Sequence, residues 1–268
     1  MSTTAALNNA LGNAQPGHVV KLADGDYVGP FTITNSGQAN APITLCGSRK
    51  AVLRNSSTIN GSAILFLRAN YWVLESFTFT HGKKGIFLEG ANHNVLDGLA
   101  VHNIGDEGVR FKFNSSYNTL QNSQLWDIGT NVDNPNINND GNGEGVYIGS
   151  SQIDGAPTNE RDASDYNRIL NNIIGPNVRS EAIDIKEGSL GGLIQGNYFD
   201  GHGTLLENSA GSWMDVKGND YLIIYNQGKY ARRPIDKDTG APTTGGGMKC
   251  ITKMTLAEIM CLQITMPI

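Results

Sequence analysis

The sequence of 268 residues has little charge, few aromatic residues and few cysteines. Charged residues make up 17% of the chain, and the formal net charge of −5 gives no reason to expect nucleic acid as a partner. No run of about 18 apolar residues is present, so we expect no membrane-spanning helix. The three cysteines are an odd count without a CxxC or His/Cys cluster, which favours neither a disulfide framework nor a zinc site.

The start of the chain also lacks the marks of a secretory signal peptide. Residues 1–7 carry no basic region and no apolar core. Glycosylation sequons begin at Asn55, Asn60 and Asn114, although such triplets arise by chance in a chain rich in Asn and Ser. We expect a secreted, extracellular protein whose signal peptide is not part of this sequence.

Asparagine and glycine are abundant instead, with 29 and 33 residues. Both are poor helix formers, which argues against a helical bundle. Hydrophobic residues make up 39% of the chain and recur throughout, which argues against a disordered chain. The composition therefore indicates a folded protein with many turns.

A short pattern recurs along the chain, in which a lead residue precedes alternating apolar and variable positions. It occurs in GIFLE (85–89), GVRFK (108–112), GVYIG (145–149), AIDIK (182–186) and WMDVK (213–217). A second strand-like pattern follows each of these segments, beginning near Asn94, Asn118, Asn167, Leu193 and Leu222. Glu107, Glu144 and Glu181 precede three of the first segments at intervals of 37 residues.

Short strands that alternate with Asn and Gly corners predict a solenoid. The repeats contain no helix pattern between the strands, which excludes leucine-rich and ankyrin repeats. We therefore predict an all-β protein, a single-stranded right-handed parallel β-helix, in which Asn and Gly take the left-handed backbone at corners. A jelly roll or sandwich is the alternative, but in-register repeats are not expected there.

The repeats also suggest how the chain is divided. Residues 1–226 are expected to form the β-helix, with a short capping helix over 3–14 that covers the apolar end of the solenoid. The repeat pattern stops near residue 227. Residues 227–268 are expected to be an irregular C-terminal tail or cap, with a short amphipathic helix in 248–268, or an aberrant end of a longer parent chain.

Alternation along the leading strands predicts two ladders of outward side chains, with rungs about 4.8 Å apart. The first ladder is Phe87, Arg110, Tyr147, Asp184 and Asp215, and the second is Glu89, Lys112, Gly149, Lys186 and Lys217. Arg110 and Lys112 are expected to bind an acidic polymer together with Asp184, Asp215 and Trp213. Aromatic rings such as Tyr147 and Trp213 offer surfaces for a sugar ring.

Two segments carry a resemblance to a known family. The first is PGHVVKLADGDY (16–27), followed by ITNSG (33–37) and APITL (41–45), and the second is SEAIDIK (180–186). Together they resemble the chondroitinase B and alginate lyase family of polysaccharide lyases, which have the pectin-lyase-like β-helix. The resemblance implies Lys186 as the general base and Glu181 as a calcium ligand. Lys217 stands where the family has an arginine, and Arg179 where it has a second acid.

This resemblance implies β-elimination on a uronic acid, in which a base removes the C5 proton and the O4 group leaves. A lysine base must be neutral, so its pKa of about 10.4 has to fall toward the working pH. We expect Lys217 to help by its charge, and Asp184 and Glu187 to hinder. Lys217 or Tyr147 is expected to protonate the leaving oxygen or to steady the carboxylate.

The glutamate ladder gives separate support for calcium. Like charges that stack on neighbouring coils repel unless a cation or backbone donors intervene, which favours a cation at Glu144 and Glu181. The alternative is that Glu107, Glu144 and Glu181 are corner carboxylates that accept backbone N–H bonds. Calcium is also an option in the loop 133–144, which is rich in oxygen ligands, although such loops are more often simple turns.

Several functions remain open beside a lyase. A non-catalytic polysaccharide-binding or cell-surface protein is the main alternative. Polygalacturonase-type hydrolysis is disfavoured because only Gly201-His202-Gly203 resembles that family and its paired acidic motifs are absent. Charged outward faces disfavour ice binding. We expect a monomer that takes an acidic polysaccharide, with neither nucleic acid nor membrane as a partner.

Overall fold

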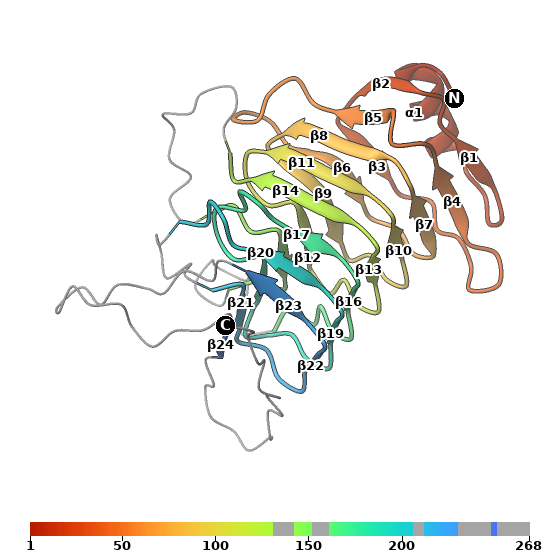
Figure 1. The fold of residues 1–268 in the computed structure, drawn as a ribbon. Helices are drawn as coiled ribbons and strands as arrows, with labels where there is room; N and C mark the ends of the chain where they lie inside the picture. The colour runs from red at the N-terminus through yellow and green to blue at the C-terminus, as the bar shows by residue number, and fades with distance from the viewer. Residues whose placement is uncertain (131–141, 152–160, 206–211, 230–247, 251–268) are drawn as a thin grey trace, which may run out of the picture.

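The strands of the chain wind into a parallel β-helix, as the repeats predicted (Figure 1). The computed structural model describes residues 1–130, 142–151, 161–205, 212–229 and 248–250. In this part of the chain the strands form three sheets of eight, and consecutive strands belong to different sheets. Each turn of the chain therefore adds one strand to each sheet.

The three sheets are named here in the order in which the chain enters them. The first sheet contains β1 (Val19–Lys21), β4 (Ile43–Cys46), β7 (Trp72–Glu75), β10 (Val95–Asp97), β13 (Thr119–Gln121), β16 (Arg168–Leu170), β19 (Leu193–Gln195) and β22 (Leu222–Ile224). The second sheet contains β2 (Gly25–Val28), β5 (Ala51–Arg54), β8 (Thr78–Gly82), β11 (Ala100–Ile104), β14 (Gln124–Ile128), β17 (Ile173–Ile174), β20 (Tyr198–Asp200) and β23 (Gln227–Lys229). The third sheet contains β3 (Phe31–Ile33), β6 (Ala63–Leu67), β9 (Lys84–Glu89), β12 (Val109–Lys112), β15 (Val146–Ile148), β18 (Ile183–Ile185), β21 (Met214–Val216) and β24 (Met248–Cys250).

The core is a set of columns of apolar side chains that run along the solenoid. In the first sheet, one inward position is leucine on four successive coils, and all four side chains are fully buried: Leu45, Leu74, Leu96 and Leu120. Because parallel strands pair in register, a period of two in each strand is sufficient to build such columns.

Asparagine side chains form a buried ladder at the corner that leads into the first sheet. The amide of Asn94 donates to Oδ1 of Asn118 at 3.0 Å, and the amide of Asn118 donates to Oδ1 of Asn167 at 3.1 Å. The same oxygens also accept backbone N–H bonds, from Asn94 and Asn118 respectively. A second ladder of this kind joins Asn172, Asn197 and Asn226 at the next corner. The excess of asparagine thus has a structural role.

Aromatic residues occupy some corners where the sequence led us to expect only Asn and Gly. Tyr71, His93, Tyr117 and Tyr166 all have a left-handed backbone, with φ between 55° and 59°. Their rings stack from coil to coil with centroids 5.0 Å apart. Stacking of the rings offsets the cost that a left-handed backbone carries for residues with a Cβ.

A helix covers the N-terminal end of the solenoid, close to the range expected. Helix α1 spans Thr4–Gly12, and the side chain of Thr3 caps it by accepting a hydrogen bond from the backbone N–H of Ala6. Leu7 and Leu11 on α1 are buried in the core of the first coil. No helix in the described residues is long and apolar enough to cross a membrane.

Strand pairing continues past residue 226, where the sequence suggested that the repeat stops. Strand β23 begins at Gln227 and pairs with β20, and β24 pairs with β21. Strand β23 was missed because QGK lacks the apolar alternation of the earlier strands, and β24 was missed because MKC, which does alternate, follows a stretch of sequence without a repeat. The amphipathic helix expected in 248–268 falls on a range of which only 248–250, in β24, is described.

Candidate functional site

The outward positions of the third sheet line up as the alternation predicted. Phe87, Arg110, Tyr147, Asp184 and Asp215 are direct partners on successive strands. Glu89 pairs with Lys112 in the parallel ladder. Farther along, the backbone N–H of Lys186 donates to Ile148 and that of Lys217 donates to Ile185, both at 2.9 Å. The two lysines therefore lie on neighbouring coils of one face.

This face is more closed than a ladder of outward side chains suggests. Tyr147 is 6% exposed, Asp184 3% and Asp215 4%. The side chains of Lys186 and Lys217 are 14% and 16% exposed. Buried charges are costly unless they are paired, so the groups at this end of the sheet must be partners of one another.

Asp184 is the centre of these ion pairs. Its Oδ2 lies 2.5 Å from Nζ of Lys186, and its Oδ1 lies 2.9 Å from Nζ of Lys217. Lys217 also lies 2.7 Å from Oδ2 of Asp215. The sequence analysis placed Asp184 and Asp215 as substrate-binding residues, whereas the structure uses both carboxylates to hold the two lysines.

The ion pair with Asp184 favours the protonated form of Lys186. Burial lowers the pKa of its ammonium, but the charge and hydrogen bond of Asp184, aided by two glutamates nearby, outweigh burial and raise the pKa above the usual lysine value. The pKa of Lys217 is raised in the same way, mainly by Asp184 against burial. Both lysines therefore carry a proton at neutral pH.

Three buried acids meet beside Lys186. Carboxylate oxygens of Glu144, Glu181 and Asp184 all lie within 4.8 Å of one another, and all three residues are buried. Burial is the largest cause that raises the pKa of Glu144 to about 8, and the charges of neighbouring carboxylates add to it. Burial, followed by the charge of Asp184, also raises the pKa of Glu181. The name acidic cluster is used below for these three residues.

The donor set of the acidic cluster fits a divalent cation. Carboxylate oxygens are the ligands that calcium prefers. Oδ1 of Asp215, on the coil next to Asp184, is buried without a hydrogen-bond partner among the described residues. Four acids, counting Asp215, face two lysines, so ionisation of Glu144 and Glu181 leaves an excess of negative charge that a divalent ion would balance. Of the loop 133–144, the alternative calcium site, residues 133–141 lie outside the described part of the chain.

Glu107, the first glutamate of the ladder, has its charge balanced by the cationic side chains that pair with it. Lys84 forms ion pairs with both Asp106 and Glu107, and Arg110 lies 2.5 Å from Glu107. Burial alone would raise the pKa of Glu107, but these cations outweigh it and hold the pKa below the usual value. Burial and then the charge of Glu107 raise the pKa of Asp106 to about 6.

Arg110 and Tyr147 belong to a stack of cations and rings on this sheet. The guanidinium of Arg110 lies 4.5 Å from the ring centroid of Tyr147, and Nζ of Lys186 lies 4.7 Å from the same centroid. Both faces of the Tyr147 ring are therefore occupied by cations. The expected flat surface for a sugar is therefore covered at Tyr147.

Trp213 does not lie on this face, contrary to the expectation from the sequence. It is 3% exposed, its ring packs against Phe199, and its Nε1 donates to the carbonyl of Lys229. Trp213 occupies the lead position of its strand, which is alanine or glycine on the three preceding coils. A large side chain at that corner turns into the core.

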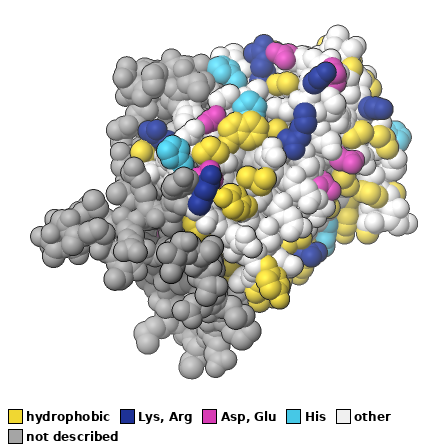
Figure 2. Space-filling model, in the orientation of Figure 1, with side chains coloured by type: hydrophobic (Ala, Val, Ile, Leu, Met, Phe, Trp, Pro, Cys, Tyr) yellow, Lys and Arg dark blue, Asp and Glu magenta, His cyan; other side chains and the backbone are white. Residues whose placement is uncertain are grey.

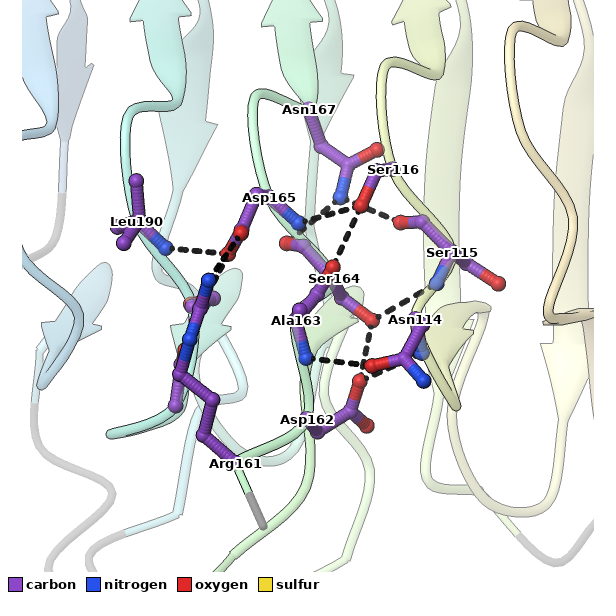
Figure 3. Close-up of polar contacts among 12 residues, drawn as sticks. Asn114, Ser115, Ser116, Arg161, Asp162, Ala163, Ser164, Asp165, Asn167 and Leu190 are labelled. Atoms are coloured by element: carbon purple, nitrogen blue, oxygen red, sulfur yellow. Dashed lines mark hydrogen bonds and ion pairs between the residues drawn. The ribbon is translucent and has the colours of Figure 1, made fainter.

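A hydrogen-bonded segment holds the chain after Lys186 in place (Figure 3). Arg161 donates to the carbonyl of Gly188 at 2.7 Å and forms a bidentate pair with Asp165. Asp162 accepts backbone N–H bonds from Phe113 and Asn114, which follow β12. The segment thus ties the coil that bears Arg110 to the coil that bears Lys186.

Charged side chains are distributed differently on the second sheet. Figure 2 shows the molecule from the side of the second sheet, where Lys and Arg are dispersed singly among Asp and Glu, between hydrophobic and uncharged side chains. Lys112, on the third sheet, keeps its Nζ 4.9 Å from the ring of Phe113. Among the expected site residues, the structure thus brings Arg110, Tyr147 and the lysine–carboxylate group together and leaves Lys112 toward the edge.

Some residues of the site had no signal in the sequence. Lys84 and Asp106 lie just outside the repeating segments, at positions that the strand pattern does not describe. From the sequence, Asp184 was expected to bind substrate and to hinder Lys186, and it was not expected to join Glu144 and Glu181 in a cation site. Its spacing of three residues from Glu181 brings the two carboxylates together because the chain turns a corner between them.

Comparison with known proteins gives one family match. Residues 1–150 match the family model described as Pel9A-like, right-handed beta helix region. Among curated proteins, pectate lyase L of Dickeya chrysanthemi is 27% identical over 141 residues, which are 47% of this chain and 32% of that protein. The match therefore spans about a third of this curated relative.

Solved structures extend the likeness to most of the chain. An alginate lyase from Paenibacillus sp. str. FPU-7 is 40% identical, with a TM-score of 0.79 over 85% of this chain and 74% of that one. Pectate lyase Pel9A, at 16% identity and a TM-score of 0.62, covers 81% of this chain and 56% of its own and shares the fold. The right-handed solenoid expected from the sequence agrees with the description of the matched family model.

Proposed function

Because the chain belongs to the Pel9A-like right-handed β-helix family, we propose that it cleaves a uronic-acid polysaccharide by β-elimination, with Lys186 as the general base. The observation that carries the proposal is the convergence of Lys186, Lys217 and the acidic cluster on one buried sheet face. Groups with shifted pKa values that gather in this way are typical of catalytic sites.

Each residue has a role in this reaction. Lys186, once neutral, takes the C5 proton of the sugar. Lys217 stays protonated beside Asp184 and Asp215, which suits a group that neutralises the substrate carboxylate or gives a proton to the departing O4. The hydroxyl of Tyr147, whose ring contacts Lys186, is the second donor for O4. Arg110 and Lys112 bind neighbouring sugar acids.

The proposal includes a cation bound at the acidic cluster. Glu144, Glu181 and Asp184 would hold calcium, which would supply positive charge beside the substrate carboxylate and offset the acids that raise the pKa of Lys186. Without that offset, Lys186 keeps its proton and is a poor base. Activity is therefore expected to need a divalent cation.

Alginate is the polymer we propose first, because the relative that is 40% identical is an alginate lyase. A protein meets a long polysaccharide such as alginate outside the cell, so we propose that this protein acts there. Pectate is the second choice, since the matched curated relative is a pectate lyase.

The test measures the ultraviolet absorbance of unsaturated uronate with alginate, pectate, chondroitin and glucuronan, each with calcium and with a chelator. The Lys186→Ala protein is expected to lose about 10²–10⁴-fold of the activity on the cleaved polymer. Lys21→Ala, an exposed lysine on the first sheet, is the matched control and should keep full activity. Full activity of the Lys186→Ala protein would show that Lys186 is not the general base.

A non-catalytic polysaccharide-binding protein is the second candidate. The pairing of Lys186 with Asp184, which keeps the lysine protonated, favours it. It predicts that the polymer binds in a calorimeter while no absorbance develops with any of the four substrates.

A further inference from the structure

Two phenylalanines continue the outward ladder of the third sheet toward the N-terminal end of the solenoid. Phe66 on β6 pairs with Phe87 on β9, and Phe87 pairs with Arg110. The two rings are tilted by 40° with centroids 5.7 Å apart, and both side chains are half-buried. The rung before them is an exposed threonine, Thr32. The phenylalanine rungs are therefore confined to two coils, on the N-terminal side of Arg110.

Aromatic side chains on the outer face of a sheet call for an explanation, because the core is already filled from the inner face. The inward positions on either side of Phe66 are held by Leu65 and Leu67, which are fully buried. Apolar groups that gather on a surface beside polar ones often mark a binding site. Ring faces of this kind are what the C–H face of a pyranose packs against.

Guanidinium groups flank both rings. Arg68 lies with its guanidinium carbon 4.8 Å from the Phe66 centroid, and Arg110 lies 5.5 Å from the Phe87 centroid. Arg68 forms an ion pair with Glu89, yet its side chain is 47% exposed. An exposed ion pair contributes little to stability, so its arginine is available to a carboxylate at small cost. A planar guanidinium binds a carboxylate through two parallel hydrogen bonds.

We propose that Phe66, Phe87 and Arg68 form a distal subsite that binds a uronic-acid residue of the polymer, away from the bond that is cut. The rings pack against the sugar and Arg68 binds its carboxylate. The subsite rests on the proposed function, because it shares the face of the third sheet with Lys186. Four rungs separate Phe66 from the rung of Asp184, which is roughly 19 Å at the rung spacing of a sheet. A disaccharide at Lys186 does not reach the subsite, whereas an octasaccharide does.

The test compares Arg68→Ala with Arg54→Ala, a matched arginine in an exposed ion pair with Asp26 on the second sheet. Binding of saturated alginate disaccharide and octasaccharide is measured by calorimetry in the Lys186→Ala background, which prevents cleavage. Arg68→Ala is expected to weaken octasaccharide binding about tenfold and leave the disaccharide unchanged, while Arg54→Ala changes neither. Phe87→Leu, which keeps an apolar side chain in the stack, should weaken only the octasaccharide as well.

Kinetics with Lys186 in place separate this inference from the proposed function. Arg68→Ala should raise KM for the polymer, leave kcat nearly unchanged and alter the lengths of the products. Unchanged KM, products and octasaccharide affinity in an active enzyme would overturn the subsite and leave the lyase assignment intact. Octasaccharide binding that depends on Arg68, in a protein that cleaves none of the polymers, would support the subsite and overturn the lyase assignment.

Discussion

Buried ladders of asparagine and of glutamate run along the corners of this solenoid, and they differ in whether their own side chains can satisfy one another's hydrogen bonds. In the asparagine ladder, the amide N–H of one residue donates to the oxygen of the next, so every coil repeats the same bonds. The glutamates at 107, 144 and 181 stack in the same register through their backbones. A carboxylate accepts hydrogen bonds but donates none, so a ladder of glutamates needs cations from elsewhere.

The glutamate ladder itself has two ends. At Glu107 the cations are side chains, Lys84 and Arg110. Glu144 accepts a hydrogen bond from the backbone N–H of Gly143 and Glu181 accepts one from the hydroxyl of Ser180, while burial and then the charges of nearby acids raise the pKa values of both. One end therefore resembles a structural ion pair, and the other has the charge of an ion-binding site. Substitutions in the two ladders test this distinction.

The largest expected effect belongs to the asparagine ladder. Asn118→Ala removes the bonds to Asn167 and to the carbonyl of Ala91, and it takes the acceptor from Asn94. Buried donors and acceptors left without partners should lower the free energy of unfolding by about 3–5 kcal/mol. Denaturant titration measures the loss.

The control for this change is an exposed asparagine in a helix. Asn8→Ala in α1 should leave stability unchanged or slightly higher, because alanine favours helix. Equal losses in both variants would show that the ladder has no special role in stability.

Glu107→Gln has the next largest expected effect. The change leaves Lys84 and Arg110 without their shared carboxylate, although Lys84 keeps Asp106. We expect a loss of about 2 kcal/mol in the free energy of unfolding, less than for full removal of a buried partner because glutamine still accepts a hydrogen bond. Calcium binding should stay as in the unchanged protein. Loss of calcium binding together with stability would mean that both ends of the ladder form one site.

The sequence was sufficient to predict the ladders because register follows from repetition. The alternation in GVRFK and AIDIK fixed which side chains share a face, and the interval of 37 residues aligned the glutamates. The burial of the outward and corner side chains was not predictable, because it depends on how side chains of neighbouring coils fill the space between them. Tyr147 is enclosed by Arg110 and Lys186, and Trp213 turns inward at a corner. Neither outcome is set by the period of a strand.

Glu144→Gln has the smallest expected effect near pH 5, and its effect on stability grows with pH. The pKa of Glu144 is about 8 in the folded protein, above the usual 4.5, so the folded state holds a proton that the unfolded state loses between these values. Stability of the chelator-treated protein should therefore fall as the pH rises from 5 to 8. The variant should match the unchanged protein near pH 5 and be more stable by up to about 4 kcal/mol near pH 9, which is the free energy that linkage assigns to a pKa shift from 4.5 to about 8.

The pH series needs only thermal or urea unfolding of the two proteins in chelator. The comparison isolates Glu144, because Asp106 and Glu181 titrate in both proteins. A variant that is less stable than the unchanged protein at pH 9 would show that the Glu144 carboxylate is paired there.

The most direct test of the distinction between the two ladders is the shift in Tm that calcium causes in the unchanged protein and in the Glu144→Gln/Glu181→Gln double variant. A ligand that binds only the folded state, at 100 times its Kd, stabilises by about 2.7 kcal/mol, which is roughly 5 °C in Tm for a chain of this size. We expect that shift in the unchanged protein and in Asn8→Ala, and none in the double variant. An equal shift in the double variant, or no shift in the unchanged protein, would contradict a cation site at Glu144, Glu181 and Asp184.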